Sequence, residues 1–207
     1  QERLMREFGL SMIATSPSVE YHLCLTRPPL SRLIQSAAEF PDPSMIKEIR
    51  EPVMNVTIYT PSRFVGPVMQ LAQEKRGVLA DHTYKADQAE LAYLIPLSDL
   101  IIDFFDRLKG ITEGYASLDY EFFDYQSVNA VKVDILVNKE KVDALSFLVP
   151  EDQARPRSRD IVERLAAAIP RQQFEAPVQA AIGGQIIARA DIKAFRKDVT
   201  QKLYGGD

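Results

Sequence analysis

The sequence predicts an α+β protein in which a β-α-β-β-α-β module is followed by a second group of strands and helices. Three observations lead to this prediction. Apolar residues alternate along "VMNVTIY" (53–59), as in a strand with one buried face, and they recur at helical spacing in "SRFVGPVMQLAQEKR" (62–76). Further strand and helix patterns then follow in the order that completes the module.

The first fifty residues are predicted to precede this module. "QERLMREFGL" (1–10) has the pattern of a helix, and it lacks an initiator Met, so we expect the chain to be a fragment of a longer protein. "MIATSPSVEYHLCL" (12–25) is predicted to be a strand. Pro43 and Pro52 favour a polar connector after it, and we place a domain boundary near Glu51.

The module begins with a strand and a helix. Along 53–59, Met54, Val56 and Ile58 share one face. Pro67 conflicts with a regular helix over 62–76, because it lacks a donor and crowds the preceding turn, so we expect this helix to start late or to bend. Its apolar face is made of Phe64, Val65, Val68, Leu71 and Ala72.

A hairpin, a second helix and a last strand complete the module. The hairpin (77–97) is expected to turn near Ala86-Asp87. We expect Ser98 to cap the second helix and Gly110 to stop it. That helix should pack Ile101, Phe104, Phe105 and Leu108. The resulting order is that of a split ferredoxin-like fold.

The last strand, "EGYASLDYEFF" (113–123), has two interpretations. Its spacing of Gly, aromatic and small residues is similar to the RNA-reading strand of an RRM, but that strand would be the third of its domain and this one is the fourth. Asp119 and Glu121 would also repel phosphates. We therefore favour a closing strand whose inner face packs on helices and consists of Ala116, Leu118, Tyr120 and Phe122.

The last third uses the same elements in another order. Strands are predicted at 131–138 and 142–149 around a turn, and a helix at 157–169 is bounded by Pro156 and Pro170. Two further strands, 173–182 and 185–190, flank Gly183-Gly184. A final helix is predicted over 191–203, capped by Asp191.

Composition and missing motifs exclude several classes of function. The chain of 207 residues has a formal charge of −4, which is not the basic excess of a typical nucleic-acid binder. Its longest apolar runs are too short to cross a bilayer. No G-x-x-x-x-G-K-[ST] loop, nucleophile elbow or cysteine pair for zinc is present, and no metal or cofactor site is expected. His22 and Cys24 share a strand face, as a nucleophile pair could, but we favour a half-buried strand with an incidental thiol.

Positive charge collects toward the C-terminus. Residues 126–207 carry 13 Lys and Arg against 11 acids, whereas residues 1–125 carry 12 against 18. These cations could form a solvated face with ion pairs or a surface that contacts phosphates. The candidates for RNA contact are Arg155, Arg157, Arg171, Arg189, Lys193, Arg196 and Lys197.

Long runs of the sequence resemble the elongation factor 4 (LepA) family of translational GTPases, which are related to elongation factor G. "QERLMREFGL" with "IATSPSVEY" resembles the end of its domain III, and 50–78 with 103–122 resembles its domain V. "VDILVNKEKVDALSFLV" (133–149), 169–199 and "YGGD" resemble the C-terminal domain of this family. The implied domains are 1–50 for part of domain III with the connector, 51–127 for domain V, and 128–207 for the C-terminal domain without its basic tail.

The resemblance implies the ribosome-binding part of a factor that promotes back-translocation or remobilises stalled ribosomes. The expected partners are rRNA, ribosomal proteins and tRNA, and this places the basic surface against RNA. GTP and Mg²⁺ are expected on a GTPase domain upstream, so the chain should be inactive alone. The family also implies a monomer in the bacterial cytoplasm, with peripheral membrane association of the full-length factor; an organellar version stays open.

Two positions depart from the family pattern within the resemblance, and two other functions stay open. Glu113 stands where the family usually has a basic residue, and Pro150-Glu151 stands where it has a basic loop. An alternative function is a structural module that docks ribosomal proteins without RNA contact. A small enzyme that uses His22 and Cys24 is the third hypothesis.

Overall fold

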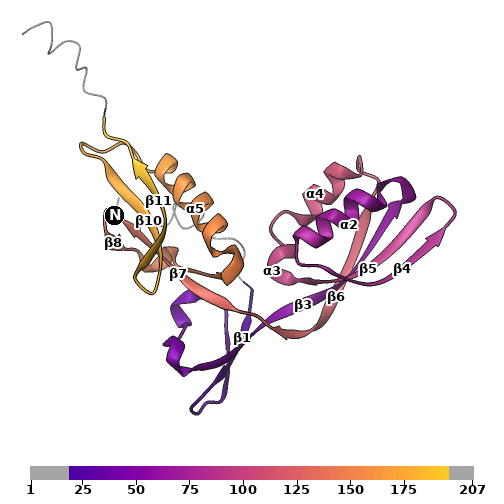
Figure 1. The fold of residues 1–207 in the computed structure, drawn as a ribbon, viewed down its shortest axis with the longest axis horizontal. Coiled ribbons are helices and arrows are strands. Elements are labelled where there is room, and N and C mark those ends of the chain that lie inside the picture. The colour runs from indigo at the N-terminus through magenta and orange to yellow at the C-terminus, as the bar shows by residue number, and fades with distance from the viewer. Residues whose placement is uncertain (1–18, 196–207) are drawn as a thin grey trace, which may run out of the picture. The chain divides into compact units, whose positions relative to one another are not determined.

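A computed structural model describes residues 19–195, which fall into two compact units, 19–129 and 130–195 (Figure 1). Each unit has its own buried apolar cluster. The expected helix at 1–10 and the residues from 196 onward lie outside the described residues. No helix within 19–195 is long and apolar enough to cross a membrane.

The first unit combines a β-sheet with short helices. Its strands are β1 (Tyr21–Leu25), β2 (Ser31–Ile34), β3 (Ile46–Pro61), β4 (Val78–Lys85), β5 (Gln88–Pro96) and β6 (Ser117–Ser127). Its α-helices are α2 (Val65–Glu74), α3 (Leu97–Leu100) and α4 (Phe104–Ile111), and short 3₁₀ turns cover 37–39, 43–45 and 62–64.

All pairings in this sheet are antiparallel. The strands run in the order β2-β1-β3-β5-β4, and β6 pairs with β3. The strands β6-β3-β5-β4 with α2 and α4 form the predicted β-α-β-β-α-β module, so the α+β fold class is confirmed. Both helices pack on one face of this sheet, over a core that includes Val56, Ile58, Leu91 and Phe104.

Strand β3 is longer than the sequence pattern indicated. Met54, Val56 and Ile58 are buried on one face, as predicted. The strand, however, continues back to Ile46 through the expected connector, where it pairs with β1, and β2 also lies in that connector. The connector interpretation was therefore wrong, because polar residues with proline can form exposed strands when a neighbouring strand supplies the hydrogen bonds.

Helix α2 starts late, as Pro67 predicted. A 3₁₀ turn (Ser62–Phe64) precedes it, and Pro67 is its third residue. The first N–H groups of a helix have no acceptor within the helix, so proline costs no hydrogen bond there. Val68, Leu71 and Ala72 are buried on its inner face.

The end of α2 holds a cationic side chain against buried acids. Arg76 has a φ of 57°, and the N–H of Gly77 donates to the carbonyl of Ala72 at 2.7 Å, which makes a Schellman cap. A Cβ on Gly77 would approach that carbonyl oxygen to 2.7 Å. The Arg76 guanidinium donates to Glu51 at 2.6 and 3.0 Å and to Asp99 at 2.6 Å. Both acidic side chains are only 5% exposed.

Two buried carboxylates share one guanidinium in this cluster. Burial by itself lowers the pKa of the Arg76 guanidinium, but the hydrogen bonds and negative charges of Glu51 and Asp99 outweigh burial and raise that pKa above its ordinary value. The cluster connects β3, the end of α2 and α3, because each of these elements supplies one of the three groups.

The second helix differs from its prediction in three respects. Ser98 lies inside α3, and its hydroxyl accepts from Arg76 at 3.3 Å instead of capping the helix. Phe105 is 51% exposed, whereas Phe104 and Leu108 are buried. Gly110 does not end α4, which runs to Ile111. The chain turns away from the helix at Glu113 and Gly114, where φ is positive at both residues.

Strand β6 has the predicted faces but not the predicted burial. Tyr120 and Phe122 stand opposite Val56 and Met54, so they share the helix-covered side of the sheet. They are nevertheless 60% and 54% exposed, while Ala116 is buried. The prediction that these two rings pack on helices was wrong, because β6 lies at the sheet edge and the short helices do not cover its later residues.

The second unit is a sheet covered by one helix. Its strands are β7 (Ala130–Val137), β8 (Glu140–Lys141), β9 (Phe147–Pro150), β10 (Ala176–Ile182) and β11 (Gln185–Ile192), in the order β11-β10-β7-β8 with β9 also paired to β7. Helix α5 (Ala154–Ala168) buries Ile161, Val162 and Leu165 against this sheet. Its other apolar residue in the prediction, Ile169, is partly buried at the helix end.

Three predictions for this unit were wrong in detail. The expected strand over 142–149 is interrupted by a 3₁₀ turn (Asp143–Leu145), because Leu145 leaves the pleat to enter the core. Helix α5 begins at Ala154, before the predicted start at 157, and it includes Pro156, which was expected to bound it. Asp191 belongs to β11 and caps no helix, since Ile192 pairs with Ala176 and is buried.

Candidate nucleic-acid interface

Two segments meet at one end of the second unit. The loop after α5 and the segment after β11 are joined by a parallel bridge between Gln172 and Ala194. The N–H of Phe195 donates to the carbonyl of Gln172 at 2.9 Å, and the Gln172 side chain donates to the carbonyl of Pro170 at 2.9 Å. The bridge and the Phe195–Gln172 bond bring together residues that are more than twenty positions apart.

This end carries both cations and exposed rings. Arg171 and Lys193 directly precede the two bridged residues, and both side chains are exposed. Phe174 is 75% exposed and Phe195 is 63% exposed. Neither cation forms an ion pair with a described residue. We name these four residues the C-terminal cluster; they offer the charge and the ring faces that single-stranded RNA contacts use.

Two of the predicted contact residues, Arg155 and Arg157, lie on α5. Arg155 is exposed and Arg157 is partly buried, both in the first turns of the helix. The N-terminus of a helix favours negative charge, so cations there are not stabilised by the helix dipole. Glu151 and Asp152 precede the helix and supply compensating charge. Contact of Arg155 or Arg157 with RNA stays a prediction.

Arg189 lies on the opposite face of the sheet from α5. Its neighbours Ala188 and Ala190 pack against the core under that helix. Its guanidinium pairs with Asp191 at 3.0 Å, and both side chains are about half exposed. The structure therefore separates Arg189 from the α5 arginines, and Arg196 and Lys197 lie outside the described residues.

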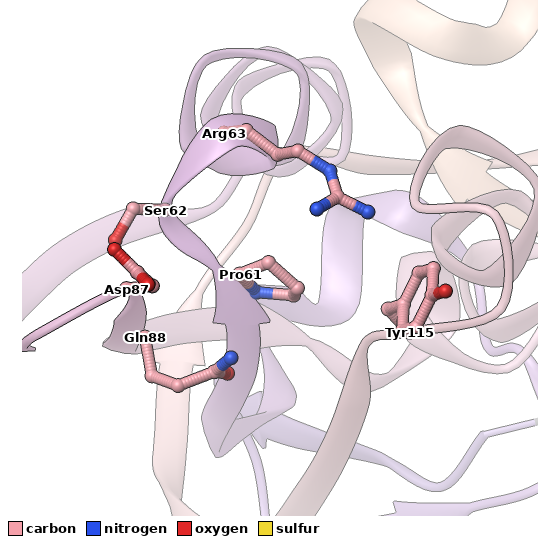
Figure 2. A pocket seen from close by; sticks show the side chains of 6 residues that line it. All are labelled: Pro61, Ser62, Arg63, Asp87, Gln88 and Tyr115. Carbon is pink, nitrogen blue, oxygen red and sulfur yellow. The ribbon is translucent and has the colours of Figure 1, made fainter.

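A second candidate site lies on the first unit. A pocket of about 460 Å³ is lined by the last residue of β3 and the 3₁₀ turn after it (Pro61, Ser62, Arg63), by the β4–β5 connection (Asp87, Gln88) and by Tyr115 (Figure 2). The N–H of Ser62 donates to the carbonyl of Asp87 at 2.7 Å, which fixes the strand end against the turn.

Arg63 and Tyr115 line this pocket, and both contact the neighbouring ring of Phe64. The guanidinium carbon of Arg63 lies 4.6 Å from the ring centroid of Phe64 and 5.2 Å from that of Tyr115. The rings of Phe64 and Tyr115 are nearly parallel, at 20°, with centroids 6.5 Å apart. Figure 2 shows the Arg63 guanidinium directed toward Tyr115. Within residues 19–195, Arg63 forms no ion pair.

Sequence motifs did not reveal this pocket, because its residues come from three separate segments. The predicted order of the elements, however, indicates that these segments meet. In a β-α-β-β-α-β sheet, the end of the first strand, the hairpin turn and the start of the last strand lie at the same end. Arg63, Asp87 and Tyr115 occupy those three places.

The proposed nucleophile pair lies on one face of β1, where Cys24 interacts with Glu48. His22 and Cys24 alternate along β1 with buried Tyr21, Leu23 and Leu25, so they share a half-buried face as predicted. The ring of His22 meets Tyr125 edge to face at 5.7 Å. No group of three or more His, Cys, Asp and Glu that could hold a metal occurs in the described part of the chain.

Comparisons with known proteins cover the whole chain. The family model described as "Elongation factor G C-terminus" matches residues 48–136, and that described as "GTP-binding protein LepA C-terminus" matches residues 137–207. Proteins named elongation factor 4 are similar throughout. That of Lactococcus lactis subsp. cremoris (strain MG1363) is 54% identical over 208 residues, that of Oceanobacillus iheyensis 52% over 208, and that of Mycoplasmopsis pulmonis 49% over 207. Each covers 100% of this chain, which spans 34% of the relative's length.

Proposed function

The chain belongs to the elongation factor 4 family, and from this premise we propose that it is the C-terminal, ribosome-binding part of a GTP-dependent translation factor. In this proposal the full-length factor promotes back-translocation or remobilises stalled ribosomes, and these units contact rRNA and tRNA. In this proposal GTP and Mg²⁺ bind to a part of the full-length factor that this chain does not span. The bacterial cytoplasm is the proposed compartment.

The C-terminal cluster is the observation that carries RNA contact. Arg171 and Lys193 are exposed cations without a described acidic partner, and two exposed phenylalanines stand beside them. Unpaired cations contribute phosphate affinity, and exposed rings offer stacking surfaces for bases. The net charge of −4 does not oppose this, because local unpaired charge, not the total, meets the phosphates.

Ribosome binding of a charge-reversed variant tests this proposal. Arg171→Glu with Lys193→Glu in the full-length factor should weaken ribosome co-sedimentation by about tenfold near physiological salt. If each cation meets one phosphate, the plot of log affinity against log salt concentration should also flatten by about 1.4 to 1.8.

The matched control is Lys139→Glu with Arg164→Glu, which changes the net charge equally on other exposed positions of the same unit. This control should pellet with ribosomes nearly as the unmodified factor does. Equal losses for both variants, or unchanged pelleting of both, would contradict the C-terminal cluster as the contact surface.

A second candidate function is docking on ribosomal proteins. Strand β6 exposes Tyr120, Phe122 and Phe123 at a sheet edge, beside Asp119 and Glu121. Carboxylates there repel phosphates, whereas exposed rings and an open strand edge suit a protein partner. Crosslinks from the factor only to ribosomal proteins, with none to RNA, would favour this function.

A further inference from the structure

The pocket of the first unit is lined by an aromatic ring, a cation without a described acidic partner, and two polar side chains, which are the groups that bind a nucleotide. We propose that it takes one unpaired nucleotide of RNA, with guanine as the preferred base. The proposal rests on the proposed function only in naming RNA as the partner, and it uses no residue of the C-terminal cluster.

Tyr115 offers the surface on which a base can stack. Its side chain is 64% exposed, and its ring is held in place by the parallel ring of Phe64 and by Arg63. A preorganised ring loses little freedom when a base covers it, and every base has a face that can stack. A base seated there lies beside Pro61, which Figure 2 shows between Arg63 and Gln88.

Arg63 is placed to hold the phosphate. Its guanidinium carbon lies over the rings of Phe64 and Tyr115, and no side chain within residues 19–195 accepts a hydrogen bond from its N–H groups, so these donors stay available. Because no described acid neutralises it, its charge is free for an anion. Stacking through the face and bidentate hydrogen bonding through the edge are the combination by which arginine binds nucleotides.

The other side of the pocket can read the base edge. Asp87 and Gln88 are exposed and line the pocket from the β4–β5 turn. A carboxylate accepts hydrogen bonds only, and guanine presents two adjacent donors, N1–H and the N2 amino group, on one edge. Uracil presents a single donor there, so Asp87 favours guanine over uracil.

The size and openness of the pocket select a single unpaired nucleotide. A volume of about 460 Å³ lies within the range of small-molecule sites. A paired base hides both its face and its edge, so recognition of this kind requires a base that is splayed out of a loop or bulge. A protein loop could also enter such a pocket, and the experiment distinguishes the two partners.

Nuclear magnetic resonance titration of the 207-residue chain with 5′-GMP tests the proposal. The backbone amides of Ser62, Arg63, Gln88 and Tyr115 should shift with GMP, and less with UMP. Tyr115→Ala should weaken GMP binding by about tenfold, and Tyr115→Phe should retain it. Asp87→Asn should remove the preference for GMP over UMP, and Arg63→Gln should weaken both nucleotides.

The control is Tyr84→Ala, which removes an exposed tyrosine of β4 that does not line the pocket. It should bind GMP as the unmodified chain does. Equal shifts with GMP and with inorganic phosphate would overturn base recognition, as would shifts with a basic ribosomal-protein peptide and none with GMP. Because this titration uses no ribosomes, its failure is distinguishable from failure of the co-sedimentation test above.

Discussion

Glu113 has a left-handed backbone conformation, which costs a non-glycine residue free energy. It occupies the left-handed position after α4, with a φ of 52°, and the N–H of Gly114 donates to the carbonyl of Lys109 at 2.8 Å. This is the bond of a Schellman cap, in which glycine is the preferred residue at the position of Glu113. The departure from the family pattern therefore coincides with a strained backbone position and not with a described contact to another chain segment.

Glu113→Gly should stabilise the first unit by about 0.5 kcal/mol. Removing the Cβ relieves a left-handed penalty of about 1–2 kcal/mol, and the greater freedom of glycine in the unfolded chain offsets part of that gain. Urea unfolding of the first unit measures the difference. Gly114→Ala is the opposite control, since its φ of 82° should make it destabilising. A less stable Glu113→Gly protein would show that its side chain contributes more than the strain costs.

Residues 113–123 lead into β6 (Ser117–Ser127), a strand whose alternation was predicted but whose burial was not. The alternation correctly assigned Ala116, Leu118, Tyr120 and Phe122 to one face. It could not show where the helices end above that face, because coverage depends on helix length and position and not on strand period. Exposed Tyr120 and Phe122 are the result.

At the scale of elements, Arg76 connects three of them. Its guanidinium lies between Glu51 of β3 and Asp99 of α3, and its backbone closes the cap of α2. Both carboxylates are buried, and the positive charge of Arg76 offsets the free-energy cost of burying them. Sequence spacing shows none of this, since the three residues are more than twenty positions apart.

Arg76→Gln should destabilise the first unit by about 3 kcal/mol, because it leaves two buried carboxylates without their cation. Chemical denaturation followed by circular dichroism provides the measurement. The matched control is Arg107→Gln, whose guanidinium pairs with Glu74 at 2.7 Å on the surface and should cost less than about 1 kcal/mol. Similar losses in the two variants would refute a special role for the buried cluster.

At the scale of the whole molecule, the two units have separate cores. Leu108 and Phe104 belong to the core of the first unit, and Leu165 and Val162 belong to that of the second. A residue that is fully buried in one core contributes its packing energy to that unit. The C-terminal cluster therefore lies on one compact unit, and the pocket lined by Arg63 and Tyr115 lies on the other.

Leu165→Ala should destabilise the second unit by about 2–5 kcal/mol through the cavity that it leaves. Amide hydrogen exchange resolved by residue should then show faster exchange in 130–195, with protection in 19–129 unchanged. Leu108→Ala should produce the reverse pattern. Loss of protection in both units from either single variant would mean that they unfold as one cooperative body.

Much of the fold could be predicted because it depends on local patterns. The alternation of 53–59, the helical face around Val68 and Leu71, and the turns at Ala86 and Gly183-Gly184 all appear where expected. The connector over 46–50 and the helix start at Asp191 were predicted wrongly, because there a neighbouring strand decided the conformation. The domain boundary near Glu51 stays a prediction; β3 runs through it without a break.

The sequence by itself determined the family, the α+β class, the order of elements and the concentration of cations toward the C-terminus, because periodicity, composition and similarity are properties of neighbours along the chain. Only the tertiary structure decided which of those cations meet, which rings stay exposed and where a pocket forms. Arg171 joins Lys193 through a bridge between distant segments, Arg189 is directed to the other sheet face, and Arg63 reaches Tyr115 across the end of a sheet. Each of these results depends on strand pairing between residues far apart in sequence, which no local pattern specifies.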